Sequence, residues 1–139
     1  MDPEQLLESF RSGMRDTLIG TLGIEVSLNG EGQIFGKMPI DRRTVQPFGL
    51  LHGGASVSLA ETLGSIAANL HVDYPDEYCV GIEVNANHLR SVKEGFVYGA
   101  AEAVKLGNRI QVWEIHITDD EGELICVSRL TLLVRKKDG

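Results

Sequence analysis

The sequence predicts an α+β fold in which an antiparallel β-sheet wraps around one long, apolar helix. One helical pattern, over residues 53–70, is mostly apolar, whereas the segments after it alternate apolar and polar residues with the period of a strand. Short polar turns separate those segments, so hairpin connections are expected instead of parallel crossovers. The chain has 139 residues, of which 42% are hydrophobic, and we expect one domain over residues 1–139 with a single core.

The first half of the chain is expected to form a helix, a hairpin and then the central helix. Apolar side chains recur at helical spacings near the N-terminus, at Leu6, Leu7, Phe10, Met14 and Leu18. This pattern predicts an N-terminal helix within residues 1–20. Residues 22–40 read as two short strands around the sequence Asn-Gly-Glu-Gly at 29–32, which predicts a β-hairpin.

Four strands joined as a meander are expected after the central helix, over residues 79–91, 95–107, 108–120 and 123–135. Strict alternation in the first of them puts one row of side chains on the face towards the helix: Val80, Ile82, Val84, Ala86 and His88. A histidine that ends an apolar row is more often a satisfied core residue than a ligand.

The composition excludes several classes of function. The formal net charge of −7 argues against nucleic acid or an anionic membrane as the main partner, although it leaves room for a small anionic ligand. No apolar run reaches the 18 or more residues of a membrane span, and the acidic N-terminus does not resemble a signal peptide, so we expect a cytoplasmic protein. Cys79 and Cys126 have no metal-type or redox-type spacing, and no nucleotide or zinc motif is present.

Glu61 stands out because it lies in the middle of the most apolar helix. On a helical wheel it belongs to a narrow polar stripe that contains no basic residue: Ser58, Glu61, Thr62, Ser65 and Asn69. The stripe is either the outer face of a half-buried helix, which is the more common case, or the lining of a crevice. In the second case Glu61 is a partly dehydrated carboxylate that can act as a base or a nucleophile.

The residues before this helix favour the crevice. His52, Gly53 and Gly54 stand at its start, where glycines let backbone N–H groups approach a ligand at the positive end of the helix dipole. Donors placed in this way can form an oxyanion hole for a carbonyl oxygen that gains charge. Gln46 and His52 add side-chain donors, and a buried Glu downstream completes a set suited to acyl chemistry.

Four segments of the sequence resemble the hotdog-fold thioesterases: residues 41–65, 85–91, 106–117 and 128–134. Within that superfamily they are similar to the PaaI-like and 4-hydroxybenzoyl-CoA thioesterases, and most of all to the enterobactin-proofreading and 1,4-dihydroxy-2-naphthoyl-CoA thioesterases. The resemblance implies a hotdog fold, a homotetramer built as a dimer of dimers, and active sites at the dimer interface. It implies hydrolysis of an acyl-CoA thioester without a metal or other cofactor.

The resemblance also implies roles for particular residues. Glu61 corresponds to the catalytic carboxylate, which acts as nucleophile or as general base. Gln46, His52 and the Gly53 N–H correspond to the groups that polarise the thioester carbonyl, and Ser65 lies beside the attacking water. The remaining matched positions contact the CoA or the acyl group: Gly81, His88, Leu89, Arg90, Ser91, Lys105, Leu106, Gly107, Asn108, Arg109 and Ile110.

These considerations predict an acyl-CoA thioesterase, with an aryl-CoA such as 1,4-dihydroxy-2-naphthoyl-CoA or hydroxybenzoyl-CoA as its substrate. The alternative is a non-catalytic acyl-CoA binding module on the same fold, because a fold by itself does not establish turnover. Glu61 separates the two, since a module that only binds has no need of a carboxylate beside the carbonyl. A hotdog dehydratase is disfavoured, because its His and carboxylate motif is missing from the sequence.

Overall fold

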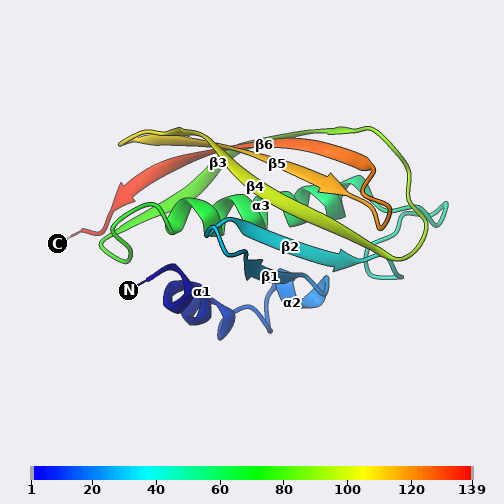
Figure 1. The fold of residues 1–139 in the computed structure, drawn as a ribbon, viewed down its shortest axis with the longest axis horizontal. Helices are drawn as coiled ribbons and strands as arrows, with labels where there is room; N and C mark the ends of the chain where they lie inside the picture. The colour runs from blue at the N-terminus through cyan, green and yellow to red at the C-terminus, as the bar shows by residue number, and fades with distance from the viewer. Residues whose placement is uncertain (1, 139) are drawn as a thin grey trace.

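A computed structural model describes residues 2–138, which form one sheet, one long helix and two short helices. In chain order the elements are α1 (Pro3–Arg11), α2 (Leu18–Thr21), β1 (Glu25–Leu28), β2 (Ile34–Pro39), α3 (Gly53–Asn69), β3 (Glu77–His88), β4 (Phe96–Leu106), β5 (Ile110–Thr118) and β6 (Leu124–Lys136). Figure 1 shows α3 lying along one face of the curved sheet, with α1 and α2 on the side of β1. The predicted α+β architecture is confirmed.

The order of the strands differs from the predicted meander. The six strands are all paired antiparallel in the order β1-β2-β4-β5-β6-β3. Only β4, β5 and β6 form a meander, whereas β3 pairs with β6 at the far edge of the sheet. The connection over residues 89–95 therefore carries the chain across to β4, beside β2. Alternation within each strand gave no information about which strands are neighbours.

The N-terminal segment also differs from the prediction, because it forms two short helices instead of one. Asp2 caps α1 with a reciprocal capping box to Gln5, and α1 ends at Arg11, followed by Ser12 and Gly13. Leu6 and Leu7 are buried as expected, but Leu18, in α2, is 60% exposed. The central helix agrees with the expected range 53–70 to within one residue at its C-terminal end.

A β-bulge in β3 makes the predicted row of inward-facing residues wrong for Val80 and Ile82 and leaves it right for Val84, Ala86 and His88. The partners of Gly81 and Glu83 on β6 are the adjacent residues Leu132 and Thr131, so Ile82 is an extra residue without a partner. The bulge exposes Val80 and Ile82, which were expected to face the helix. Cys79 and Gly81 take the places expected for Val80 and Ile82, since their β6 partners Val134 and Leu132 pack on or in the core.

Glycines in the sheet set how closely α3 approaches it. Gly36 of β2 and Gly99 of β4 are directly paired, and the fully buried Leu63 of α3 lies against both of them. A β-carbon at either glycine would lie 2.6 Å from a methyl group of Leu63. On the helix side, a β-carbon at Gly64 would lie 2.6 Å from a Leu130 methyl group. The sheet and the helix therefore fit together because these positions lack side chains.

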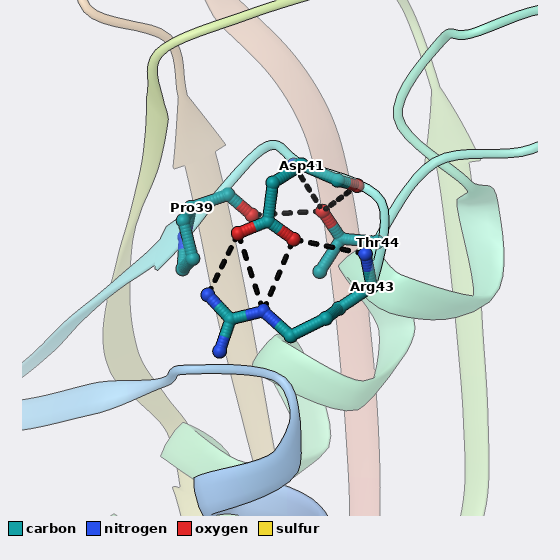
Figure 2. A network of polar contacts seen from close by, with 4 residues as sticks. All are labelled: Pro39, Asp41, Arg43 and Thr44. Carbon is teal, nitrogen blue, oxygen red and sulfur yellow. Dashed lines mark hydrogen bonds and ion pairs between the residues drawn. The ribbon is translucent and has the colours of Figure 1, made fainter.

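The loop between β2 and α3 is held by a polar network around Thr44, which is 1% exposed (Figure 2). The Thr44 hydroxyl donates to the Pro39 carbonyl at 2.8 Å and accepts from the Asp41 N–H at 3.0 Å. The Thr44 carbonyl accepts from the His52 N–H at 2.8 Å, so the network fixes the residue that precedes α3. Beside it, the hydrogen bond from the Arg43 side chain lowers the pKa of Asp41.

Replacing Gly99 by Ala should destabilise the fold by about 1–3 kcal/mol, because the new methyl group overlaps Leu63 in a closely packed core. Urea unfolding followed by circular dichroism measures the change. Gly30→Ala is the matched control, since nothing lies within 4 Å of its β-carbon position, and its effect should stay within about 0.5 kcal/mol. Equal stability of the two variants would contradict the role given to Gly99.

Candidate active site

The polar stripe of α3 faces the edge strand β3. All five of its members are half-buried, and the apolar residues on the other side of the helix, such as Leu59 and Leu63, are buried. Glu61 reaches the strand at Gly81, where a β-carbon would lie 2.6 Å from its Oε2 atom. Glu61 is thus neither on an open surface nor deep in the core. Its carboxylate lies between α3 and β3, against the backbone of Gly81.

Most polar groups of the stripe are satisfied by the helix itself. The Ser58 and Thr62 hydroxyls donate to the carbonyls four residues earlier, and the Asn69 amide donates to the Ser65 carbonyl at 2.8 Å. Among residues 2–138, the Glu61 carboxylate and the Ser65 hydroxyl form no hydrogen bond or ion pair with protein groups. One helical turn separates these two side chains, and both remain available to a ligand or to water.

The N-terminus of α3 carries a second set of polar groups. His52 is the N-cap, and its Nδ1 atom accepts from the Gly54 N–H at 2.8 Å. In the neutral ring the proton is therefore on Nε2, which makes this exposed nitrogen a donor. The Gly53 N–H has no acceptor within residues 2–138, as expected in the first turn of a helix. The ring of His88 covers Gly53, since a β-carbon there would lie 2.9 Å from the His88 Nε2 atom.

A tight turn before the helix orients Gln46. The Gln46 side-chain oxygen accepts from the Phe48 and Leu50 N–H groups, and Gly49 closes the turn with φ +81°. Because the oxygen is used in this way, the amide nitrogen of Gln46 is the part of the side chain that can donate to a ligand. Phe48, at the tip of the turn, is 85% exposed.

A cavity of about 360 Å³ brings six of the predicted site residues together. It is lined by Gln46, Leu51, Gly53, Ser56, His88, Leu89, Arg90, Ser91 and Ile125. Three of the lining residues were not predicted. Ser56 lies three residues after Gly53 on the same helix, so helical spacing could have identified it. Leu51 and Ile125 have no signal in the sequence, because only the folding of β6 beside β3 brings Ile125 here.

Other predicted residues lie elsewhere in the chain. Glu61 follows Gly53 by eight residues, which is about 12 Å along a helix, and it does not line the cavity. A separate cavity of about 420 Å³ contains the turn between β4 and β5; the predicted residues among its lining are Leu106, Gly107, Asn108 and Arg109. His52, Ser65, Lys105 and Ile110 line neither cavity.

The charges and thiols around these sites limit the available chemistry. Arg90 lies 3.9 Å from the Asp119 carboxylate, which is 10% exposed. Its other guanidinium N–H groups have no partner among residues 2–138 and can bind another anion. Burial raises the pKa of Cys79 to about 11, so its thiol is protonated at neutral pH and is not a nucleophile.

Within the described residues, no three His, Cys, Asp or Glu side chains form a candidate metal site. None of the helices described here has the length and apolar character needed to span a membrane.

Comparison with known proteins gives one consistent family. Residues 48–126, more than half of the chain, match the Thioesterase superfamily. The Bacillus subtilis protein ComA2 is 53% identical over 124 residues, covering 89% of this chain and 98% of its own. The 1,4-dihydroxy-2-naphthoyl-CoA hydrolase of Escherichia coli is 46% identical over 128 residues, covering 92% of this chain and 93% of its own.

A solved structure supports the same assignment. A thioesterase from Haemophilus influenzae superimposes with a TM-score of 0.88 at 48% sequence identity, covering 94% of this chain and 90% of that one. The antiparallel sheet wrapped on a single long helix agrees with this match along the length of the chain. The chain therefore belongs to the thioesterase superfamily and has its hotdog fold.

Proposed function

We propose that the protein hydrolyses the thioester bond of an aryl-CoA, such as 1,4-dihydroxy-2-naphthoyl-CoA or hydroxybenzoyl-CoA. The observation that carries the proposal is the Glu61 carboxylate, which lies beside Gly81 and has no hydrogen-bond or ion-pair partner within residues 2–138. A 46% identical relative is named as a 1,4-dihydroxy-2-naphthoyl-CoA hydrolase, which supports an aromatic acyl group. A module that only binds acyl-CoA remains the competing function.

The chemistry divides between the two sets of polar groups. The Gly53 N–H and the Gln46 amide donate hydrogen bonds to the thioester carbonyl oxygen, and the His52 Nε2–H is a further donor. These donors stabilise the negative charge that develops on the oxygen when the carbonyl carbon is attacked. Glu61 either removes a proton from the attacking water or attacks the carbon itself, in which case water then hydrolyses the acyl–Glu61 anhydride and regenerates the carboxylate. Ser65 holds the water on either route. The C–S bond then breaks, and the thiolate leaves as CoA after protonation. The reaction needs no metal.

The spacing along α3 supports a site shared between two subunits. Gly53 and Glu61 are about 12 Å apart along one helix, too far to act on the same carbonyl. The edge strand β3 has one unpaired side and exposes Val80 and Ile82 there, which suits pairing with the β3 of a second copy. In an antiparallel pair the two α3 helices also run in opposite directions, so Gly53 of one copy approaches Glu61 of the other. Two such dimers would form the homotetramer.

We assign CoA binding to two segments, which line two different cavities of the subunit. The first follows β3 and includes Arg90, and the second is the turn around Arg109. Arginine suits phosphate because its guanidinium group can donate two parallel hydrogen bonds. The assignment of the neighbouring residues of both segments to CoA binding belongs to the same proposal: His88, Leu89, Ser91, Lys105, Leu106, Gly107, Asn108 and Ile110.

Replacing Glu61 by Gln should lower kcat for aryl-CoA hydrolysis at least ~10²-fold and leave binding of the substrate nearly unchanged, because the anion is lost but the size is kept. Steady-state kinetics with benzoyl-CoA and 1,4-dihydroxy-2-naphthoyl-CoA, in the presence and absence of EDTA, measure this effect. Glu102→Gln, at an exposed position of β4, is the control. Substrate binding without turnover by the unmodified protein would favour the binding module instead.

Replacing Gly81 by Ala should lower kcat at least ~10-fold with a smaller change in KM, because the new methyl group overlaps the Glu61 carboxylate and moves it from its position. Gly13→Ala is the control, since the nearest atom to its β-carbon position is 3.7 Å away. Circular dichroism establishes that both variants fold. A folded Gly81→Ala variant with unchanged kcat would show that the position of Glu61 beside Gly81 is not the one used in catalysis.

Mixing two inactive variants tests the shared site. Glu61→Gln and Gln46→Ala each damage every site of a homodimer, but a mixed dimer regains one undamaged site from two half-sites. Co-refolding of equal amounts should therefore restore roughly a quarter of the wild-type activity. Light scattering should detect a dimer or a tetramer. No recovery of activity in mixed dimers of demonstrated composition would place Glu61 and Gln46 in the same subunit's site.

A further inference from the structure

Ser56 is a buried polar residue of the candidate site to which no role has been given so far. It lies on α3, three residues after Gly53, and lines the same cavity as Gly53 and Gln46. Only 2% of the residue is exposed. A side chain that is both polar and buried needs a hydrogen-bond partner, in the protein or in a ligand.

The Ser56 hydroxyl has no hydrogen-bond partner among residues 2–138. Other hydroxyl groups of α3 do have one, since Ser58 and Thr62 donate to the carbonyls four residues earlier. The equivalent acceptor for Ser56 is the His52 carbonyl, which accepts from the Ala55 and Ser56 N–H groups instead, at 3.0 and 3.2 Å. A buried hydroxyl left in this way is unfavourable unless water or a ligand satisfies it.

This hydroxyl is directed into the cavity. Within the described part of the chain, no wholly buried side-chain nitrogen or oxygen atom lacks a hydrogen-bond partner. Because the Ser56 hydroxyl has no partner there, it must keep some exposed surface, although very little of the residue is exposed. Ser56 lines the cavity at Gln46, so this is the space into which the hydroxyl opens.

Helix geometry places the hydroxyl beside the first turn of α3. The Cα–Cβ bonds of a helix are tilted towards its N-terminus, and residues three apart lie on the same face. The Ser56 side chain therefore extends towards Gly53, whose N–H has no acceptor within residues 2–138. The ring of His88 covers Gly53 from β3. Three hydrogen-bond donors thus line one cavity: the Gly53 N–H, the Gln46 amide and the Ser56 hydroxyl.

We propose that the Ser56 hydroxyl donates a hydrogen bond to the thioester carbonyl oxygen and is the third donor of the oxyanion hole, with the Gly53 N–H and the Gln46 amide. This assignment rests on the thioesterase function proposed above. His52 fits the position less well, because it is exposed and does not line the cavity. A hydroxyl suits it, because its hydrogen can rotate towards the oxygen that gains negative charge.

Replacing Ser56 by Ala should lower kcat for benzoyl-CoA at least ~10-fold and change KM less than ~3-fold, because the lost hydrogen bond is strongest when the oxygen carries negative charge. Ser56→Cys keeps nearly the same size but has only a weak donor, so it should lose as much and separates hydrogen bonding from packing. Ser58→Ala is the matched control, since the Ser58 hydroxyl is bonded to the Gly54 carbonyl and lies outside the cavity lining. Thermal unfolding followed by circular dichroism establishes that all three variants fold.

The loss should be similar for benzoyl-CoA and 1,4-dihydroxy-2-naphthoyl-CoA, because every thioester has the same carbonyl oxygen. A loss confined to one of the two substrates would overturn the assignment and make Ser56 a contact of the acyl group. Wild-type kcat in the folded Ser56→Ala and Ser56→Cys variants, or a rise in KM alone, would overturn it as well. If the unmodified protein hydrolyses no acyl-CoA at all, the thioesterase proposal fails instead, so the two failures are distinguishable.

Discussion

The close approach of α3 to the sheet is the constraint on which the rest of the structure depends. Gly36 and Gly99 leave room for Leu63, and Gly64 leaves room for Leu130, so the helix lies nearer to the strands than side chains would allow. The helix and a strand also approach closely at a polar position. Gly81 admits the Glu61 carboxylate to the inner face of β3, where any β-carbon would overlap it. Core packing and the position of the candidate catalytic carboxylate thus both depend on glycines in the strands that face α3.

This geometry separates the polar groups of the site into two sets on one helix. The first turn of α3 presents the Gly53 N–H and the His52 ring, and the third turn presents the Glu61 carboxylate. Within the described part of the chain, the N–H has no acceptor and the carboxylate has no partner. Either set alone is incomplete for thioester hydrolysis, because an oxyanion hole needs an attacking group within reach of the same carbonyl. A free β-strand edge next to the helix is the feature that allows a second copy to complete the site.

The bulge in β3 links the fold to the proposed function. By inserting Ile82, it turns Gly81 towards Glu61 and also places Val80 and Ile82 on the exposed surface of the edge strand. On the other side of the bulge, Cys79 continues the inward-facing row, and its N–H donates to the Asn69 side-chain oxygen, which ties helix and strand together.

The sequence by itself determined the fold class and most of the elements, and it singled out Glu61 as the one acidic residue of the most apolar helix. Helical and strand periodicity are local properties, so they located α3 almost to the residue and separated the polar stripe from the apolar face. The backbone donors at Gly53 and Gly54 could be predicted for the same reason, because the first N–H groups of any helix lack partners within the helix.

Only the tertiary structure determined which strands and side chains lie next to one another. Three features depend on strands that are far apart in the chain. These are the position of β3 beside β6, the β-bulge at Ile82 and the place of Ile125 in the lining of the Gln46 cavity. The contact between Glu61 and Gly81 is of the same kind: alternation had placed Val80 and Ile82 towards the helix, and only the pairing with β6 put the glycine there. Periodicity describes which face a residue occupies within its own element, but the register between elements is set by the packing of the whole sheet.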